Sequence, residues 1–176
     1  MQIKKHIPNT ITLFNLASGL LAIIAIFKGY YDEAFLFVCL GIFFDFWDGF
    51  FARKFKVSGE LGLQLDSLAD VVSFGVAPAF IVFQFLRLSL ATDMNALNHL
   101  PIGLYISFLI PMAGAYRLAR FNIDTEQTTY FKGVPIPMIG ILTAAFPLIY
   151  WQSNSRIVEL LFKAPIFWYA YILLVS

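Results

Sequence analysis

Long hydrophobic runs separated by short polar connectors make up most of the chain. A helix needs about 20 mostly apolar residues to cross the hydrocarbon core of a membrane. Six segments approach this length: 9–27, 33–53, 62–87, 100–121, 133–151 and 157–175. The connectors between them are rich in Gly, Asn, Asp, Ser and Lys, which favour turns or water. The pattern predicts an all-α, polytopic membrane protein folded as a six-transmembrane-helix bundle.

The same pattern predicts a single domain over residues 1–176, because the chain shows no long repeat and no low-complexity segment. Residues 1–8 are basic and precede the first apolar run, so we expect a short interfacial segment there. The run that follows lacks the small-residue cleavage site of a signal peptide and is expected to stay as the first span. The last run stops at Ser176 without a polar tail, as a truncated chain would.

Composition and charge agree with a membrane protein. The chain is 60% hydrophobic and 13% charged, whereas about a quarter of the residues in a soluble domain are charged. The net charge of +1 gives no indication of a nucleic-acid partner. Positive charge gathers at the span ends on one side, which the positive-inside rule makes cytoplasmic. The residues on that side are Lys4, Lys5, Arg53, Lys54, Lys56, Arg117, Arg120 and Lys132. We therefore expect a cytoplasmic (inner) membrane location with the N-terminus and the connector 54–61 in the cytoplasm.

Four aspartates interrupt the second and third apolar runs. Asp45 and Asp48 are three residues apart, and Asp66 and Asp70 are four apart. These spacings place each pair on one face of its helix. If the two helices are antiparallel neighbours, Asp45 and Asp70 each lie about 12 Å from the cytoplasmic helix ends, at 1.5 Å per residue. All four carboxylates are then expected at one level, a turn or two inside the cytoplasmic boundary.

Four ionised carboxylates at this depth require neutralisation, because one aspartate at a helix centre costs about 2.5 kcal/mol or more and like charges repel. Protonation of some of them and binding of cations are the two solutions. Converging carboxylates suit hard divalent ions such as Mg²⁺ or Mn²⁺, and two dications balance four charges. Pairing with lysines or helix N-termini is the structural alternative, but spans 33–53 and 62–87 carry no basic residue at matching depth. We therefore predict a site for two divalent cations.

Small residues and one arginine accompany the aspartates. Gly49 and Ala52 leave the aspartate face of the second span bare, and Gly62 does the same at the start of the third. Small residues let a ligand approach the backbone, with close helix packing as the alternative. Arg53 offers a planar fork that suits phosphate. Together these residues predict a phosphate or pyrophosphate pocket that opens to the cytoplasm.

The spacing Asp45-x2-Asp48-Gly49-x2-Ala52-Arg53-x8-Gly62-x3-Asp66-x3-Asp70 resembles the signature of the CDP-alcohol phosphotransferases at all eight positions. Four further stretches resemble the phosphatidylserine synthase branch of that family: PNTITLFNLASG (8–19), DSLADVVSFGVAP (66–78), RLARFN (117–122) and FKGVPIP (131–137). The resemblance extends over about residues 8–150. It implies the family's six-helix fold and makes 1–176 an integral membrane catalytic domain.

The resemblance implies an enzyme that transfers the phosphatidyl group from CDP-diacylglycerol to the hydroxyl of L-serine and releases CMP. It implies two Mg²⁺ or Mn²⁺ ions on the four aspartates, Asp70 as general base, and a homodimer. Gly49, Ala52, Arg53 and Gly62 would line the CDP part of the substrate. The polar residues Asn9, Thr12 and Asn15 match positions of that branch and either face the nucleotide or serve as helix cap and polar packing.

Serine recognition requires a partner for the serine carboxylate. Arg117 and Arg120 lie three residues apart on one helix face, and a guanidinium binds a carboxylate strongly. Asn122 and Lys132 are near them in sequence. Anchoring at the inner membrane surface is the alternative role for the two arginines.

Two other functions remain open at this point. The eight-position signature does not separate phosphatidylserine synthases from enzymes that make phosphatidylglycerophosphate, inositol lipids or archaetidylserine. A divalent-cation transporter is the alternative from another class, since intramembrane carboxylates also mark ion pathways. A transporter predicts acidic residues that continue across the membrane, but the interiors of the two spans carry none beyond Asp45 and Asp70.

Overall fold

The computed structural model describes residues 3–57, 59–90, 101–123 and 135–176, and these residues form helices without strands. The elements, in chain order, are α1 (Ile3–Lys28), α2 (Tyr31–Phe55), α3 (Glu60–Asp70), the π-helical turn η1 (Val71–Val76), α4 (Ala77–Ser89), the 3₁₀ segment η3 (Ile102–Phe108), α5 (Leu109–Ile123), α6 (Ile136–Gln152), α7 (Arg156–Lys163) and α8 (Pro165–Val175). The all-α class predicted from the sequence is confirmed for this part of the chain.

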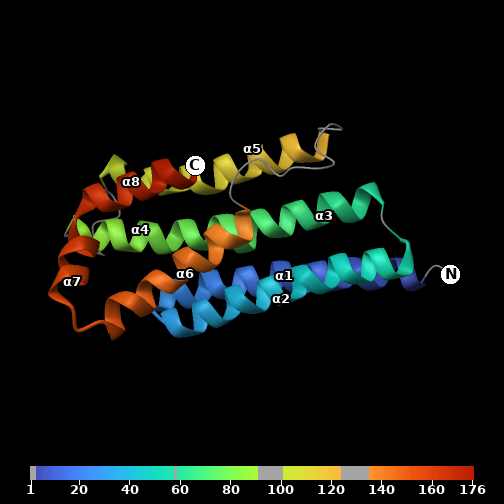
Figure 1. The fold of residues 1–176 in the computed structure, drawn as a ribbon, viewed down its shortest axis with the longest axis horizontal. Coiled ribbons are helices and arrows are strands. Elements are labelled where there is room, and N and C mark those ends of the chain that lie inside the picture. Colours follow the sequence, from blue (N-terminus) through green and yellow to red (C-terminus); the bar gives the residue numbers. More distant parts are fainter. Residues whose placement is uncertain (1–2, 58, 91–100, 124–134) are drawn as a thin grey trace.

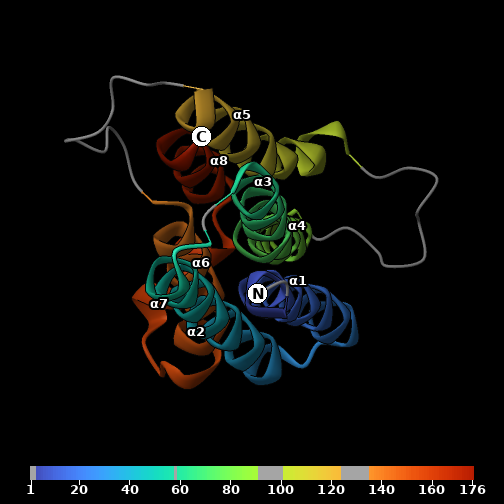
Figure 2. The same cartoon turned by 90° about the vertical axis from the view of Figure 1, so that its right-hand side faces the viewer.

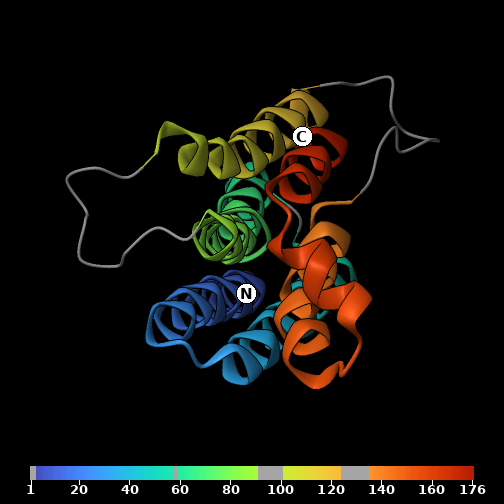
Figure 3. The same cartoon turned by 90° about the vertical axis from the view of Figure 1, so that its left-hand side faces the viewer.

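Helices α1 to α5 and α8 run roughly along the long axis of the molecule, α6 runs obliquely, and α7 lies across one end (Figure 1). α3, η1 and α4 form one rod at the centre of the bundle, with α1, α5, α6 and α8 around it (Figures 2 and 3). α1 packs extensively against α2 and also against α3, whereas α2 and α3 make little backbone contact with each other within the described residues. The start of α1, the α2–α3 connection and the end of α5 share one end of the bundle, and α7 covers the other (Figure 1).

Left-handed residues end α1 and α2 and keep their connections short. Gly29 has φ 77° and Lys56 has φ 54°. After each of them the chain closes the helix end with an N–H that reaches back five residues, from Tyr30 to the Ala25 carbonyl and from Val57 to the Ala52 carbonyl. These tight ends turn the chain back on itself, so α1, α2 and α3 run in alternating directions.

Four described segments are long and apolar enough to cross a membrane: His6–Lys28, Tyr31–Phe55, Glu60–Ser89 and Ile102–Ile123. They correspond closely to the first four spans predicted from the sequence. The protein is therefore a multi-pass membrane protein.

The predicted count of six spans is not confirmed. α6 has 17 residues and reaches about 26 Å, which is less than the roughly 30 Å of a hydrocarbon core. The run predicted as a single span over 157–175 is divided into α7 and α8, which are bent by 72° at the break. Pro165 explains the division, because it restricts Ala164 to an extended conformation, with φ −84° and ψ 115°.

The central rod passes a proline without breaking. Within η1 the turns are one residue wider than in an α-helix, and the Ala77 N–H donates to the Val72 carbonyl five residues back. Pro78 follows directly and has no N–H to donate. The wide turn accommodates its ring, so Glu60–Ser89 remains one span. The π-helical turn η1 begins immediately after Asp70, at the level of the aspartates.

Close contacts at η1 and an aromatic cluster hold the bundle together. A Cβ atom built on Gly19 would lie 2.7 Å from Ser73 Cα, and one on Gly140 would lie 3.1 Å from Phe74 Cα. α1 and α6 therefore both press against η1. At the α7 end, the Phe85 ring stacks on Trp168 with 4.7 Å between centroids, and the rings of Phe146, Phe162 and Phe167 pack around this pair.

We predict that Gly140→Ala destabilises the protein by about 1–3 kcal/mol, because the added methyl group meets the Phe74 backbone. Thermal unfolding in detergent micelles measures this as a lower midpoint. Gly114→Ala is the matched control, since its Cβ would lie 3.4 Å from the end of the Ile136 side chain, an ordinary contact. Equal midpoints for the two variants would contradict the prediction.

Candidate metal centre

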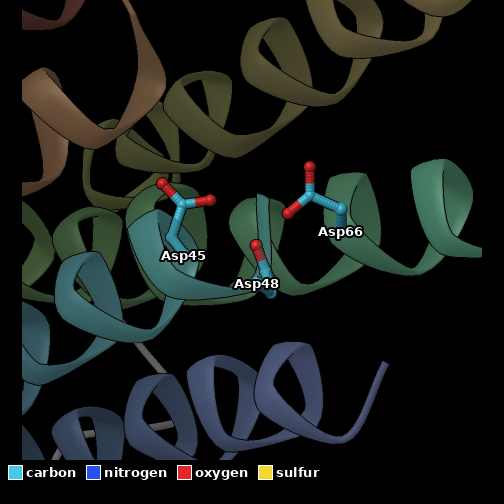
Figure 4. A group of neighbouring side chains, drawn as sticks. All are labelled: Asp45, Asp48 and Asp66. Carbon is cyan, nitrogen blue, oxygen red and sulfur yellow. The ribbon is translucent and has the colours of Figure 1, made fainter. Parts of the chain in front are cut away.

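Carboxylates from α2 and α3 converge on one small volume. Asp45 and Asp48 of α2 and Asp66 of α3 each offer an oxygen, and these three oxygens all lie within 4.8 Å of one another. Figure 4 shows the three side chains directed toward a shared space between the two helices. Asp70 lies one turn further along α3, is buried, and interacts electrostatically with Asp45 and Asp66. The structure therefore brings the four predicted aspartates together.

Two side chains of α1 donate hydrogen bonds into this cluster. The Thr12 hydroxyl donates to Asp48 Oδ2 at 2.5 Å, and Asn15 Nδ2 donates to Asp70 Oδ1 at 3.1 Å. Both α1 residues are buried. α1 thus contacts an aspartate of α2 and an aspartate of α3 from one side.

The donor set of the cluster fits divalent cations. Asp66 Oδ1 is buried and has no hydrogen-bond partner among the described residues. A buried acceptor without a partner is unfavourable unless another group satisfies it. Carboxylate oxygens are the ligands that Mg²⁺ and Mn²⁺ prefer, and a bound ion would satisfy Asp66 and reduce the repulsion within the cluster.

A cavity of about 190 Å³ opens beside the aspartates, between α1, α2 and α3. Asp48 and Asp66 form part of its wall. Six of the seven residues predicted to bind the CDP part of a substrate also line it: Asn9, Thr12, Gly49, Ala52, Arg53 and Gly62. The seventh, Asn15, does not line this cavity, because it is fully buried and its side chain faces Asp70.

The two glycines of this wall leave room for polar side chains. A Cβ on Gly49 would lie 3.3 Å from Arg53 Nη1, so the guanidinium lies over the bare helix surface. There it interacts electrostatically with Asp48. A Cβ on Gly62 would lie 3.3 Å from Asn9 Oδ1. A side chain at either glycine would crowd the polar groups of the cavity wall.

Three of the four residues predicted to bind serine lie on α5 and make different contacts. Arg117 donates to the Val175 carbonyl of α8 at 3.3 Å, Arg120 is exposed, and neither lines the cavity beside the aspartates. Asn122 Nδ2 donates to the hydroxyl of Ser67, the neighbour of Asp66, at 2.8 Å. Asn122 Oδ1 is buried without a hydrogen-bond partner among the described residues. Lys132 lies outside the described residues.

Comparison with known proteins agrees with the sequence motif. The pattern of the CDP-alcohol phosphatidyltransferase family matches residues 5–176. The chain is 36% identical, over 82% of its length, to CDP-diacylglycerol–serine O-phosphatidyltransferase of Bacillus subtilis (strain 168) and spans 77% of that protein. It is 35% identical, over 84% of its length, to archaetidylserine synthase of Methanothermobacter thermautotrophicus, of which it spans 60%. It is 36% identical, over 75% of its length, to CDP-diacylglycerol–serine O-phosphatidyltransferase of Saccharomyces cerevisiae, of which it spans 50%.

We predict that the purified protein binds Mn²⁺ and that Asp66→Asn weakens this binding by at least about 10-fold, since even indirect disturbance of a metal site has effects of this size. Electron paramagnetic resonance of free Mn²⁺ measures the affinity. Asp32→Asn is the control, because Asp32 is an exposed acid in the first turn of the same helix that carries Asp45 and Asp48. An unchanged affinity in Asp66→Asn would remove this carboxylate from the metal centre.

Proposed function

The chain belongs to the CDP-alcohol phosphatidyltransferase family, and we propose that it transfers the phosphatidyl group of CDP-diacylglycerol to the hydroxyl of L-serine. One observation carries the choice of acceptor: the Bacillus and yeast relatives, each 36% identical to this chain, are both named for serine and CDP-diacylglycerol. The archaeal relative is named for a serine lipid as well.

The reaction is a displacement at phosphorus. The serine oxygen forms a bond to the phosphorus that carries diacylglycerol, the bond from that phosphorus to the bridging pyrophosphate oxygen breaks, and CMP leaves with the electron pair. Asp70 accepts the hydroxyl proton, as a carboxylate within reach of the acceptor can. Asn15 donates a hydrogen bond to Oδ1 of Asp70 and so helps to hold this carboxylate in place.

The other residues of the site bind and neutralise. Asp45, Asp48, Asp66 and Asp70 would hold two divalent cations, which would supply charge stabilisation to the attacking and leaving oxygens. Arg53 binds the pyrophosphate through its fork, and Gly49, Ala52 and Gly62 leave room for the nucleotide beside it. Of the residues predicted to bind serine, we keep Asn122 in that role. Its side chain donates a hydrogen bond to Ser67, the neighbour of Asp66, and so lies beside the aspartates.

The membrane arrangement follows from charge and length. We place the end of the bundle with the aspartates at the cytoplasmic side of the inner membrane, because Arg53, Lys54 and Lys56 lie at the α2–α3 connection. α6 then forms a short fifth span, and the bent pair α7–α8 belongs to the sixth. A homodimer follows from the resemblance to the family.

We expect CMP release from CDP-diacylglycerol by the purified protein to require both Mg²⁺ or Mn²⁺ and L-serine. Chromatography of radiolabelled products identifies the acceptor. Faster CMP release with glycerol 3-phosphate or inositol phosphate would assign the chain to another branch of the family, and a preference for the archaeal ether-lipid substrate would make it an archaetidylserine synthase. Metal-ion flux into protein-containing liposomes without CMP release would favour the transporter.

Asp70→Asn is expected to lower turnover by about 100-fold or more, the contribution of a general base, while the protein still inserts and folds. CMP release and the thermal unfolding midpoint are the two measurements. Glu60→Gln serves as control, since Glu60 is an exposed acid in the first turn of the same helix. Wild-type turnover in Asp70→Asn would exclude Asp70 as the base.

A further inference from the structure

One face of α1 carries two buried hydrogen-bond donors at a spacing of three residues. Thr12 donates to Asp48 of α2, and Asn15 donates to Asp70 of α3. The exposed fractions of the two α1 side chains are 3% and 0%. Each donor occupies one oxygen of its aspartate, so the two helices that carry the acidic residues are both fixed to the same face of α1.

The position of this face is itself fixed along the bundle. The Ser73 hydroxyl of η1 donates to the Asn15 carbonyl at 2.9 Å. One turn further, Gly19 allows α1 to approach Ser73 so closely that a Cβ would lie 2.7 Å from Ser73 Cα. Because η1 begins directly after Asp70, this contact sets the height of Asn15 relative to Asp70.

We propose that Thr12 and Asn15 are positioning residues of the metal centre. By engaging one oxygen each of Asp48 and Asp70, they orient the remaining oxygens toward the space shared by the four carboxylates. Groups that hydrogen-bond to metal-binding carboxylates have this role in many metal sites. The inference rests on the proposed function for its catalytic part, and it gives these two residues a task other than contact with the nucleotide.

Other buried polar residues of the bundle show what packing alone requires. Ser18 of α1 donates to the Phe14 carbonyl of its own helix. The Thr143 hydroxyl of α6 contacts the Ile139 carbonyl of its own helix and also the hydroxyl of Tyr171, a neutral partner on α8. The Thr12 hydroxyl also lies 3.1 Å from the Pro8 carbonyl, so its own helix would satisfy it. Its shorter contact is nevertheless with Asp48. Asn15 even leaves its own Oδ1 without a hydrogen-bond partner among the described residues while its amide serves Asp70.

The test measures Mn²⁺ affinity in the absence of substrate, by electron paramagnetic resonance on the full chain in micelles. Thr12→Val and Asn15→Leu keep the size of each side chain and remove the donor. We expect each to weaken Mn²⁺ binding by about 10- to 100-fold. Thr143→Val removes a hydroxyl with similar burial far from the carboxylates and should leave the affinity unchanged, and Thr12→Ser, which keeps the donor, should restore most of it.

Steady-state kinetics supply a second readout. Loss of positioning is expected to raise the Mn²⁺ concentration needed for half-maximal activity and to lower kcat, with little change in the KM for serine. Wild-type Mn²⁺ affinity in both variants would overturn the proposal, and so would an effect confined to the KM for CDP-diacylglycerol, which would place the two residues at the nucleotide. If Thr12→Val does not fold, Thr12→Ala compared with Thr12→Ser provides the same contrast.

The metal measurement does not depend on the acceptor. A wild-type protein that binds Mn²⁺ but releases no CMP with serine would refute the proposed function, while the affinities of the variants would still decide the positioning role. A wild-type protein without Mn²⁺ affinity would overturn the positioning role directly.

Discussion

Four carboxylates held inside an apolar bundle create an electrostatic strain that hydrophobic packing cannot relieve. Each ionised group loses hydration when it enters the bundle, and each repels its neighbours. In the structure, α1 donates hydrogen bonds to Asp48 and Asp70. Asp66 Oδ1 has no hydrogen-bond partner among the described residues. The converging carboxylates have the donor set of a divalent-cation site.

α1 is the element that makes this arrangement possible. The expected convergence of the aspartates assumes that the second and third spans are direct neighbours. In the structure α2 and α3 make little backbone contact within the described residues, and α1 packs against both. The separation of α2 and α3 leaves room for the cavity, and the carboxylates of Asp45, Asp48 and Asp66 point toward a shared space between these helices (Figure 4). α1 is thus the helix against which both α2 and α3 pack, so its position along η1 determines whether the four aspartates meet.

The sequence is sufficient for those features that depend on chain-local patterns. Run length gives the first four spans, and helical spacing gives the faces of the aspartates. The sequence pattern does not predict the break between α7 and α8 at Pro165. Hydropathy is averaged over many residues, and this bend is caused by a single residue. The sequence also leaves Asn15 ambiguous, since the same amide suits a nucleotide and a carboxylate and only the approach of α3 decides between them. Likewise, the spacing of Arg117 and Arg120 suits a fork, but spacing alone does not reveal that Arg117 donates a hydrogen bond to the Val175 carbonyl of α8.

The two ends of the bundle differ in how densely they are packed. A cavity at the aspartate end removes packing contacts between α2 and α3, and lost dispersion contacts weaken a membrane bundle in particular, because lipid supplies no hydrophobic force between helices. Compensation comes from elsewhere in the chain. Gly19 and Gly140 allow backbone-close contact on both sides of η1, and the rings around Trp168 fill the α7 end. Dense packing at η1, directly after Asp70, therefore permits an open cavity beside the candidate metal centre.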